Sequence, residues 1–310
     1  MRGVVYRGTL VGFFTLALLV TGVAQAEQIN LCGKTFDSRA QRVDLQGARC
    51  DDLASAARLT RIQTLNLKGA QVSDLSPLAG LTTLVELDLT WTAVSDVRAL
   101  RGLHKLKRLS LRDTRVKNLT PLKDLKRLEY LNVAGSRVAD LSPLRGLVNL
   151  KHLALCYTAV SDLTPVAKLK NLRKLLLRGT SIACLVPLAG LKNLRSLSLW
   201  QTKVEDLSPV KGLTALEELG LFMTPVSDLA PLTSLKKLRV LFLSETKVQN
   251  LAPLKGMRHL SKLYLKKTPV RDLTPLRNVV SLKWLWVKGQ SKKQVRALKA
   301  ALPELAIRGF

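Results

Sequence analysis

The sequence is short of the residues that build most catalytic and metal-binding sites. Among its 310 residues are three histidines and four cysteines, and these are scattered instead of lying at metal-ligand spacing. It contains no glycine-rich phosphate loop and no known catalytic signature. Beyond residue 26, no stretch is long and apolar enough to anchor the chain in a membrane. These absences argue against nucleotide-dependent, metal-dependent and membrane-spanning functions.

Acidic and aromatic side chains are also scarce. The chain has 22 Asp and Glu against 50 Lys and Arg, a formal net charge of +28, and its aromatic content is only 5%. A field this positive favours encounter with polyanions such as acidic proteins, anionic glycans, anionic lipid or nucleic acid. The alternative interpretation is that the charge only maintains solubility. Composition leaves both interpretations open.

The longest apolar run lies at the N-terminus. Arg2 and Arg7 form a basic segment, residues 10–20 an apolar core, and residues 24–26 a small-residue cleavage site. This order is typical of a secretory signal peptide. We therefore expect cleavage near Ala26, a secreted or periplasmic chain, and a net charge of +26 once the two arginines are removed.

Leucine at a fixed interval dominates the rest of the chain. From Leu65 to Leu285 a leucine recurs every 22 residues without a miss, and the same step reaches Val43 and Ile307. A fixed period in the twenties is typical of a solenoid, in which each unit buries its apolar face only against its neighbours.

Each repeat has the pattern of a strand, a turn and a tight helix. Leu87 and Leu89 alternate with other residues, as in a strand with one buried face. Ser or Thr before Pro, as at Ser76, predicts an N-cap followed by Pro at the first helical position, and leucines three apart predict a short, tight helix. A column of aspartates just before this segment predicts a structural role in the turn: Asp74, Asp96, Asp140, Asp162, Asp206, Asp228 and Asp272.

The repeat resembles the leucine-rich repeat family, in particular the 22-residue bacterial units of internalin-like proteins, over about residues 43–290. The resemblance implies an α/β solenoid: a curved horseshoe with a concave parallel β-sheet and short convex helices. Where the family pattern has Asn or Cys, this chain has hydroxyl residues, which we expect to form a buried ladder that satisfies backbone groups between coils. They are Thr92, Thr114, Ser136, Thr158, Thr180, Thr202, Thr224, Thr246 and Thr268.

The repeat divides the chain into four parts. We expect a signal peptide at 1–26, an N-terminal cap and first atypical repeat at 27–61, leucine-rich repeats at 62–290, and a C-terminal cap at 291–310. In the last part, helical spacing predicts a helix over 292–302, ended by Pro303, and a final strand over 305–307. Such a polar unit would protect the exposed edge of the sheet.

The four cysteines fall into two pairs with different expectations. Cys50 takes the place of a buried Val or Ile in the first repeat, and Cys32 lies upstream in the expected cap. We expect a disulfide between them, which would close a loop of roughly 18 residues and stabilise the chain by about 3 kcal/mol. Cys156 and Cys184 occupy different places in adjacent repeats, so we expect two free thiols.

The aromatic residues avoid every column that the register buries. Between residues 40 and 300 all nine lie elsewhere, seven on the concave face and two, Trp91 and Tyr157, at its rim. Phe242, Tyr264 and Trp286 share one column, so their backbones are expected to lie about 4.8 Å apart. Exposed rings among lysines predict a protein interface or stacking against a sugar or base; the alternative is that they only strengthen cross-strand packing. The predicted partner-binding residues are Trp91, Tyr130, Tyr157, Trp200, Phe222, Phe242, Tyr264, Trp284, Trp286, Lys262, Lys266 and Lys288.

The N-terminal half of the concave face is charged. Glu86 and Asp88 share a strand, a pairing that suggests glycoside hydrolysis, but Arg108 and Arg112 on the next strand favour a neutralised salt-bridge cluster. A Cys156–His152 nucleophile lacks a third, orienting group. We therefore expect no catalytic site, no metal and no cofactor.

Two binding hypotheses follow. The first is an exported, non-enzymatic recognition scaffold that binds a macromolecular partner, an envelope or host protein, through the aromatic and basic concave face. The alternative is binding of an anionic glycan, lipopolysaccharide or membrane surface through the basic surface, while expected export disfavours nucleic acid. Charge-driven binding fades steeply with salt, and aromatic-anchored binding does not.

Overall fold

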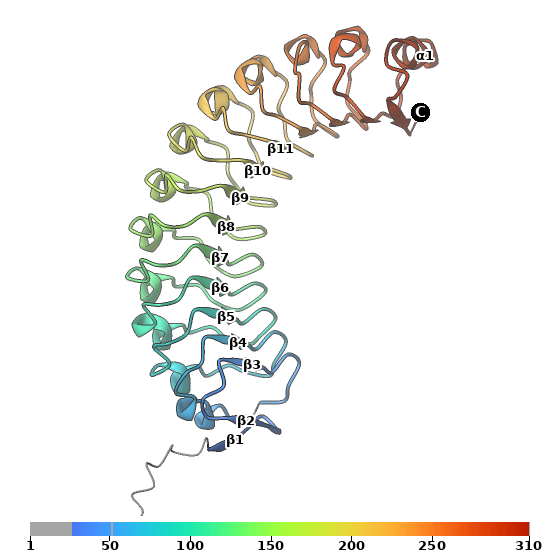
Figure 1. Ribbon diagram of the computed structural model, residues 1–310. Helices are drawn as coiled ribbons and strands as arrows, with labels where there is room; N and C mark the ends of the chain where they lie inside the picture. Colours follow the sequence, from blue (N-terminus) through green and yellow to red (C-terminus); the bar gives the residue numbers. More distant parts are fainter. Residues whose placement is uncertain (1–26, 51, 310) are drawn as a thin grey trace, which may run out of the picture.

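The structure, a computed structural model, describes residues 27–50 and 52–309, so the predicted signal peptide lies outside the described residues. The chain winds into an arch in which each coil adds one short strand to a single 13-stranded sheet (Figure 1). The strands follow chain order: β3 (Arg42–Asp44), β4 (Thr64–Asn66), β5 (Glu86–Asp88), β6 (Arg108–Ser110), β7 (Tyr130–Asn132), β8 (His152–Ala154), β9 (Lys174–Leu176), β10 (Ser196–Ser198), β11 (Glu218–Gly220), β12 (Val240–Phe242), β13 (Lys262–Tyr264), β14 (Trp284–Trp286) and β15 (Ala306–Arg308). This confirms the predicted leucine-rich horseshoe.

All neighbouring strands of this sheet are parallel and in one register. Leu197 lies opposite Leu175 on one side and Leu219 on the other, so residues 22 apart are neighbours throughout. Parallel strands 4.7–4.9 Å apart, roughly, set the rise of each coil. Residues that occupy the same position in successive repeats, called a column here, therefore lie side by side in a row across the sheet.

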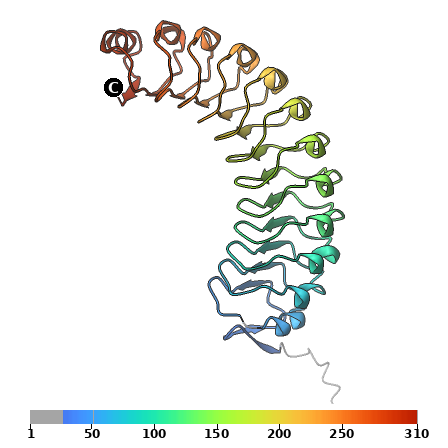
Figure 2. The same cartoon turned by 180° about the vertical axis from the view of Figure 1, so that it is seen from behind.

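Short 3₁₀ helices return the chain along the outer side of the arch (Figure 2). They are η1 (Ala54–Arg58), η2 (Ser76–Leu78), η3 (Arg98–Gly102), η4 (Thr120–Leu122), η5 (Ser142–Leu144), η6 (Thr164–Val166), η7 (Val186–Leu188), η8 (Ser208–Gly212), η9 (Ala230–Ser234), η10 (Ala252–Leu254) and η11 (Thr274–Asn278). Their three-residue period matches the leucines three apart that the sequence analysis singled out.

Carboxylates of the aspartate column, and not hydroxyls of the Ser/Thr column, accept the first backbone N–H of seven of these helices. Ser76 is the first residue of η2, and the N-cap position belongs to Leu75, so the predicted N-cap role of Ser and Thr was wrong. Instead, Asp74 Oδ1 accepts the N–H of Ser76 at 2.9 Å and its hydroxyl at 2.7 Å. All seven aspartates accept the N–H two residues on, which confirms their role in the turn. The side-chain bond with Ser76 holds the pKa of Asp74 below its ordinary value.

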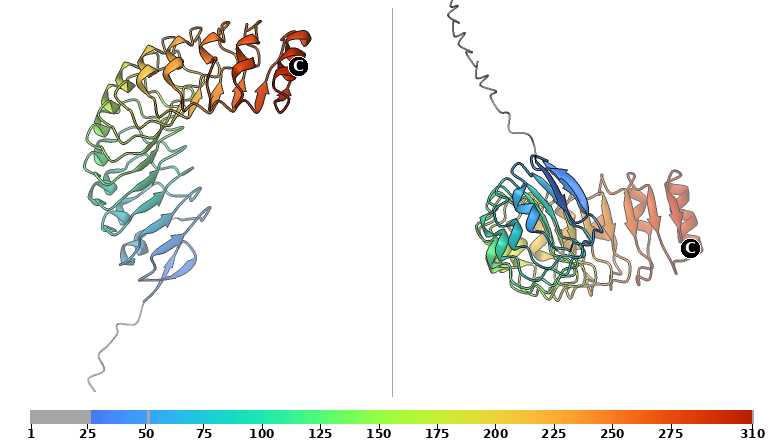
Figure 3. Two further views of the ribbon diagram at one scale, coloured as in Figure 1. Left: turned by 45° about the horizontal axis from the view of Figure 1, so that its top comes forward. Right: turned by 90° about the horizontal axis from the view of Figure 1, so that it is seen from below.

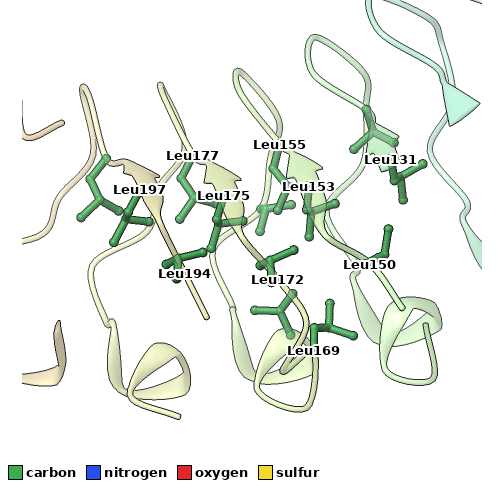
Figure 4. Packing of buried hydrophobic residues seen from close by; sticks show 14 of the residues in the cluster. Leu131, Leu150, Leu153, Leu155, Leu169, Leu172, Leu175, Leu177, Leu194 and Leu197 are labelled. Atoms are coloured by element: carbon green, nitrogen blue, oxygen red, sulfur yellow. The ribbon is translucent and has the colours of Figure 1, made fainter. Parts of the chain in front are cut away.

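The interior is a stack of leucines between the sheet and the 3₁₀ helices. Figure 4 shows Leu153, Leu175 and Leu197 from successive strands packing with leucines of the returning segments. Fully burying one such side chain contributes roughly 1.5–3 kcal/mol, and most of that burial depends on the neighbouring coil. Within the described part of the chain no buried side chain is aromatic, which confirms the aliphatic columns.

The column of hydroxyls works within each coil instead of between coils. Thr92 Oγ1 donates to the carbonyl of Leu89, three residues back, at 2.7 Å, and the other seven threonines do the same. The prediction that these hydroxyls bond from coil to coil was therefore wrong, although the residues are buried as predicted. Ser136 Oγ is buried without a partner. It lacks the β-methyl that stiffens the side-chain torsion of threonine.

The two ends of the arch differ from the repeats. At the N-terminal end, β1 (Gln28–Leu31) and β2 (Lys34–Asp37) form an antiparallel hairpin (Figure 3), and the Cys32–Cys50 disulfide confirms the predicted bridge. At the C-terminal end, helix α1 (Lys292–Ala301) buries Val295 and Leu298, and β15 extends the sheet. Cys156 and Cys184 are free thiols, as expected. In the described residues no helix is long and apolar enough to cross a membrane.

Candidate functional site: the concave face

Six aromatic side chains gather over strands β10–β14 on the face of the sheet opposite the leucine interior. Two of them are nearly half exposed, Trp284 with 47% and Trp286 with 45% of its area, and the other four are more deeply buried. We call this group the aromatic patch: Trp200, Phe222, Phe242, Tyr264, Trp284 and Trp286. Exposed aromatic surface of this extent is unusual on a soluble protein and marks a candidate interaction site.

The rings of the patch contact one another across coils. Phe242 and Tyr264 stack with centroids 4.4 Å apart and planes 17° apart, and Tyr264 stacks on Trp286 at 6.2 Å and 18°. Trp200 meets Phe222 and Phe242 edge-on at 5.7 and 5.3 Å. Stacking in one column follows from the register, because residues 22 apart are neighbours.

Glycines make room for three of the aromatic rings. A Cβ placed on Gly220 would lie 2.1 Å from the indole nitrogen of Trp200, so this indole covers the bare backbone of the next coil. Its position over Gly220 lets Trp200 reach Phe242, two coils away. Gly179 does the same for Tyr157, and Gly309 lies beside Trp286.

Arg178 links the patch to Tyr157 and was missed by the sequence analysis. Its guanidinium carbon lies 5.3 Å from the Tyr157 ring centroid and 5.4 Å from that of Trp200, within the range of cation–π attraction. The available signal was its column, which is the column of Trp200 one repeat earlier. The backbone of Tyr157, at the rim of the face, lies in the left-handed region with φ 56°.

Lysines border the patch. Lys262, Lys266 and Lys288 are exposed. Lys267 belongs to the same group but pairs with Glu245 at 3.2 Å. The three lysines leave the rim of the patch positively charged.

The other half of the face is polar. Strands β4–β7 enclose a hollow of about 390 Å³, the polar hollow, lined by Thr64, Asn66, Lys68, Glu86, Asp88, Thr90, Arg108, Ser110, Arg112, Tyr130 and Asn132. Glu86 pairs with Arg108 at 3.8 Å, as the salt-bridge interpretation expected. Asp88 instead accepts the N–H of Thr90 at 2.9 Å, and Arg112 pairs with Asp113 at 3.0 Å.

Two predicted partner-binding residues lie in this polar half, away from the aromatic patch. Tyr130 lies under Arg108, whose guanidinium carbon is 4.4 Å from the ring centroid, and beside His152 at 6.2 Å. Trp91 is 56% exposed and donates from Nε1 to Asp113 at 2.8 Å. The structure thus separates the predicted site into two groups.

The Cys156–His152 pair lacks the lowered thiol pKa of an activated cysteine nucleophile. Burial raises the pKa of the Cys156 thiol, which keeps it protonated near neutral pH. Burial, with Lys174 nearby, lowers the pKa of His152. Among the described residues no group of His, Cys, Asp or Glu is arranged to hold a metal ion.

Comparisons with known proteins agree with this architecture. A family model described as "Leucine Rich repeats (2 copies)" matches residues 104–146 and 170–212. An internalin (inlF) from Listeria monocytogenes is 26% identical, with a TM-score of 0.84 over 89% of this chain and 83% of that one. Internalin C2 from the same species is 32% identical, with a TM-score of 0.57 over 60% of this chain and 80% of that one.

A leucine-rich-repeat protein of Leptospira interrogans has the same fold, with 23% identity and a TM-score of 0.75 over 82% of this chain and 74% of that one. The comparison with curated protein sequences gives no match. The parallel sheet, the 22-residue coil and the 3₁₀ returns define a leucine-rich-repeat solenoid. The chain belongs to the bacterial, internalin-like type of this family.

Proposed function

We propose that this chain is an exported, non-enzymatic recognition scaffold that binds a protein partner through the aromatic patch. The observation that carries the proposal is the patch itself: five rings in mutual contact over β10–β14 and Trp284 on the same face of β14, with Trp284 and Trp286 nearly half exposed, on a curved sheet. Interfaces concentrate their binding energy in such aromatic anchors. Export is supported by the signal-like segment at 1–26 and by the Cys32–Cys50 disulfide, a bond typical of oxidising compartments.

The packing of the rings favours a protein over a glycan. A sugar binds an aromatic side chain by lying on its open face. In the patch, Tyr264 has Phe242 on one face and Trp286 on the other, and Trp286 also lies against Gly309. The three stacked rings therefore present edges and apolar flanks, which suit insertion into side-chain pockets of a partner.

The charges around the patch favour an acidic partner. In the described part of the chain no carboxylate lies within 4.0 Å of the ammonium groups of Lys262, Lys266 and Lys288 at its borders, and the whole chain is strongly basic. Such a field raises association rates with acidic surfaces, and mutation of rim charges changes those rates more than the affinity.

Structures with the same fold act as ligand-binding scaffolds. A plant peptide hormone receptor, RGFR1, was solved in complex with RGF2, and TLR13 with a single-stranded RNA. At 16% and 20% identity these neighbours support the architecture of a scaffold, and the chemistry of the patch supports a protein as its partner.

The test is affinity capture with two variants that each remove two rings. The chain from Glu27 is immobilised and exposed to envelope and host-cell extracts at 0.15 M and 0.5 M salt, and retained proteins are quantified. Trp286→Ala/Tyr264→Ala removes a Trp and a Tyr from the patch, and Trp91→Ala/Tyr130→Ala removes the same pair of residue types from the polar half. We expect a protein retained by wild type and the control in both salts and lost with the patch variant. Equal recovery of every protein by all three chains would sink the proposal.

A further inference from the structure

A second hollow lies on the flank of the arch, along the segments that lead from the 3₁₀ helices back to strands β11–β14. Its volume is about 600 Å³. We call it the flank hollow, lined by Glu217, Lys237, Arg239, Arg258, His259, Ser261, Ser281 and Lys283. It shares no residue with the aromatic patch.

Two serines create the space. Ser261 stands between Arg239 and Lys283 in three successive coils, as the backbone bonds Ser261 N–H to Arg239 O at 2.8 Å and Lys283 N–H to Ser261 O at 2.9 Å show. Its hydroxyl turns back to the Arg239 carbonyl at 3.1 Å, and that of Ser281 donates to the Leu260 carbonyl at 2.8 Å. Both short side chains are therefore occupied with the backbone and leave the hollow unfilled.

The cations of the flank hollow form no ion pair with any residue that the structure describes, whereas two cations of the same column in other coils do. In earlier coils of the column that contains Arg239 and Lys283, Lys151 pairs with Glu129 at 2.7 Å and Arg195 with Glu217 at 3.5 Å. Between Arg239 and Lys283 in this column, the chain has the uncharged Ser261.

No ion pair within 4.0 Å links any of the four cations lining the hollow to a carboxylate in the described part of the chain. These cations are Lys237, Arg239, Arg258 and Lys283. Its one acid, Glu217, is already held by Arg195.

We propose that the flank hollow binds a phosphate group. Four unpaired cations around one concavity, with His259 at its wall, supply the charge-assisted donors that phosphate oxygens require. The Arg239 and Lys283 backbones are two strand spacings apart, about 9–10 Å, so side chains from both sides reach one anion between them. The chain thus has an anion site separate from its proposed protein-binding face.

The direct test fills the gap with the residue that the column uses elsewhere. Ser261→Glu places a carboxylate between Arg239 and Lys283, as Glu129 and Glu217 stand beside their basic neighbours. The probe is inositol hexakisphosphate, measured by isothermal titration calorimetry at 0.1 M salt. We expect Ser261→Glu to weaken binding at least about tenfold while the melting temperature stays within a few degrees of wild type.

A charge-matched pair of variants separates the site from the general field. Arg239→Ala/Lys283→Ala and Lys107→Ala/Arg173→Ala each remove two cations from the same column, the second pair outside the hollow. We expect a loss of about tenfold from the first and less than about threefold from the second. Equal losses from both, unchanged binding by Ser261→Glu, or no binding by wild type would each overturn the proposal.

A second arm identifies the source of the phosphate. Vesicles containing phosphatidylglycerol are sedimented with the wild-type chain and with Ser261→Glu. Co-sedimentation that Ser261→Glu abolishes assigns the site to a lipid headgroup. Binding of inositol hexakisphosphate alone, lost in the same variant, assigns it to a soluble phosphate. Co-sedimentation unaffected by Ser261→Glu would contradict the assignment of lipid binding to this hollow.

Discussion

The two halves of the concave face share one backbone and use its side chains differently. In the polar half, Asn66 and Asp88 follow the central leucine of their strands, and each accepts the backbone N–H two residues on, at 3.0 and 2.9 Å. In the aromatic half, the same column holds Phe242, Tyr264 and Trp286, which stack on one another across coils. Side chains that bond their own coil have fewer free hydrogen-bonding groups for a partner, whereas stacked rings keep apolar edges exposed. The residue that each coil carries at this one position of the repeat therefore decides what the face can bind.

The largest expected difference between the halves concerns the disulfide, which lies only at the polar end. Replacing Cys32→Ser and Cys50→Ser removes a bridge across 18 residues and should lower the free energy of unfolding by about 3 kcal/mol. Because repeats contact only their neighbours, hydrogen exchange should quicken in β1–β4 and stay unchanged in β10–β14. Faster exchange along the whole sheet would argue against this local coupling.

In the interior, by contrast, equivalent substitutions should lower the free energy of unfolding by similar amounts in both halves. Thr92→Ala in the polar half and Thr246→Ala in the aromatic half each leave a buried carbonyl without its hydroxyl donor, and each should cost about 1–2 kcal/mol in urea denaturation. Ser136→Ala is the matched control, because its hydroxyl has no partner, and should cost less than about 0.5 kcal/mol. A cost for Ser136→Ala equal to that of the threonines would refute the role assigned to the hydroxyl bond.

A third prediction concerns the aromatic half alone. Gly220→Ala places a methyl group where the Trp200 indole lies, so the ring must move and lose its edge contacts with Phe222 and Phe242. We expect a cost of about 1 kcal/mol and a changed near-ultraviolet circular dichroism spectrum. Gly80→Ala, where a Cβ meets nothing within 4 Å, should change neither. An unaltered spectrum for Gly220→Ala would contradict the packing described.

The smallest effect belongs to the aspartate column, which both halves share. Hydrogen bonds from Ser or Arg side chains two residues on lower the pKa values of Asp74, Asp96 and Asp206 below 3.8. A lowered native pKa means that the stabilisation is complete above the unfolded value and lost as the pH falls through the folded one. The melting temperature should therefore drop below about pH 4.

The control for this acid dependence replaces the carboxylates with amides. Asp74→Asn/Asp206→Asn should flatten the acid limb of the melting curve while keeping the turns, since Asn118 already caps Thr120 through the same bond at 2.8 Å. An acid limb as steep as that of wild type would show that other groups titrate.

Much of this architecture could be predicted from the sequence, because a repeat makes the pattern of buried residues periodic. The 22-residue leucine column predicted the register, and the aliphatic columns placed the rings on the open face. Other features depend on side-chain rotamers and on which coil a group reaches, which the period does not specify. Thus Asp74 replaced Ser76 as the cap, Thr92 bonded its own coil, and Arg178 reached two rings at once. The flank hollow lies where Ser261 interrupts a column of charged residues and Ser281 adds a second short side chain, and the period specifies neither.

The most direct test of the account is the affinity of the first captured protein for three chains, measured by surface plasmon resonance at 0.15 M salt. Loss of two hot-spot rings costs roughly 2 kcal/mol or more, so Trp286→Ala/Tyr264→Ala should weaken binding by about 30-fold or more. Trp91→Ala/Tyr130→Ala should stay within about threefold of wild type. The reverse order, with the polar-half variant losing more affinity than the patch variant, would contradict the claim that the aromatic half is the docking surface.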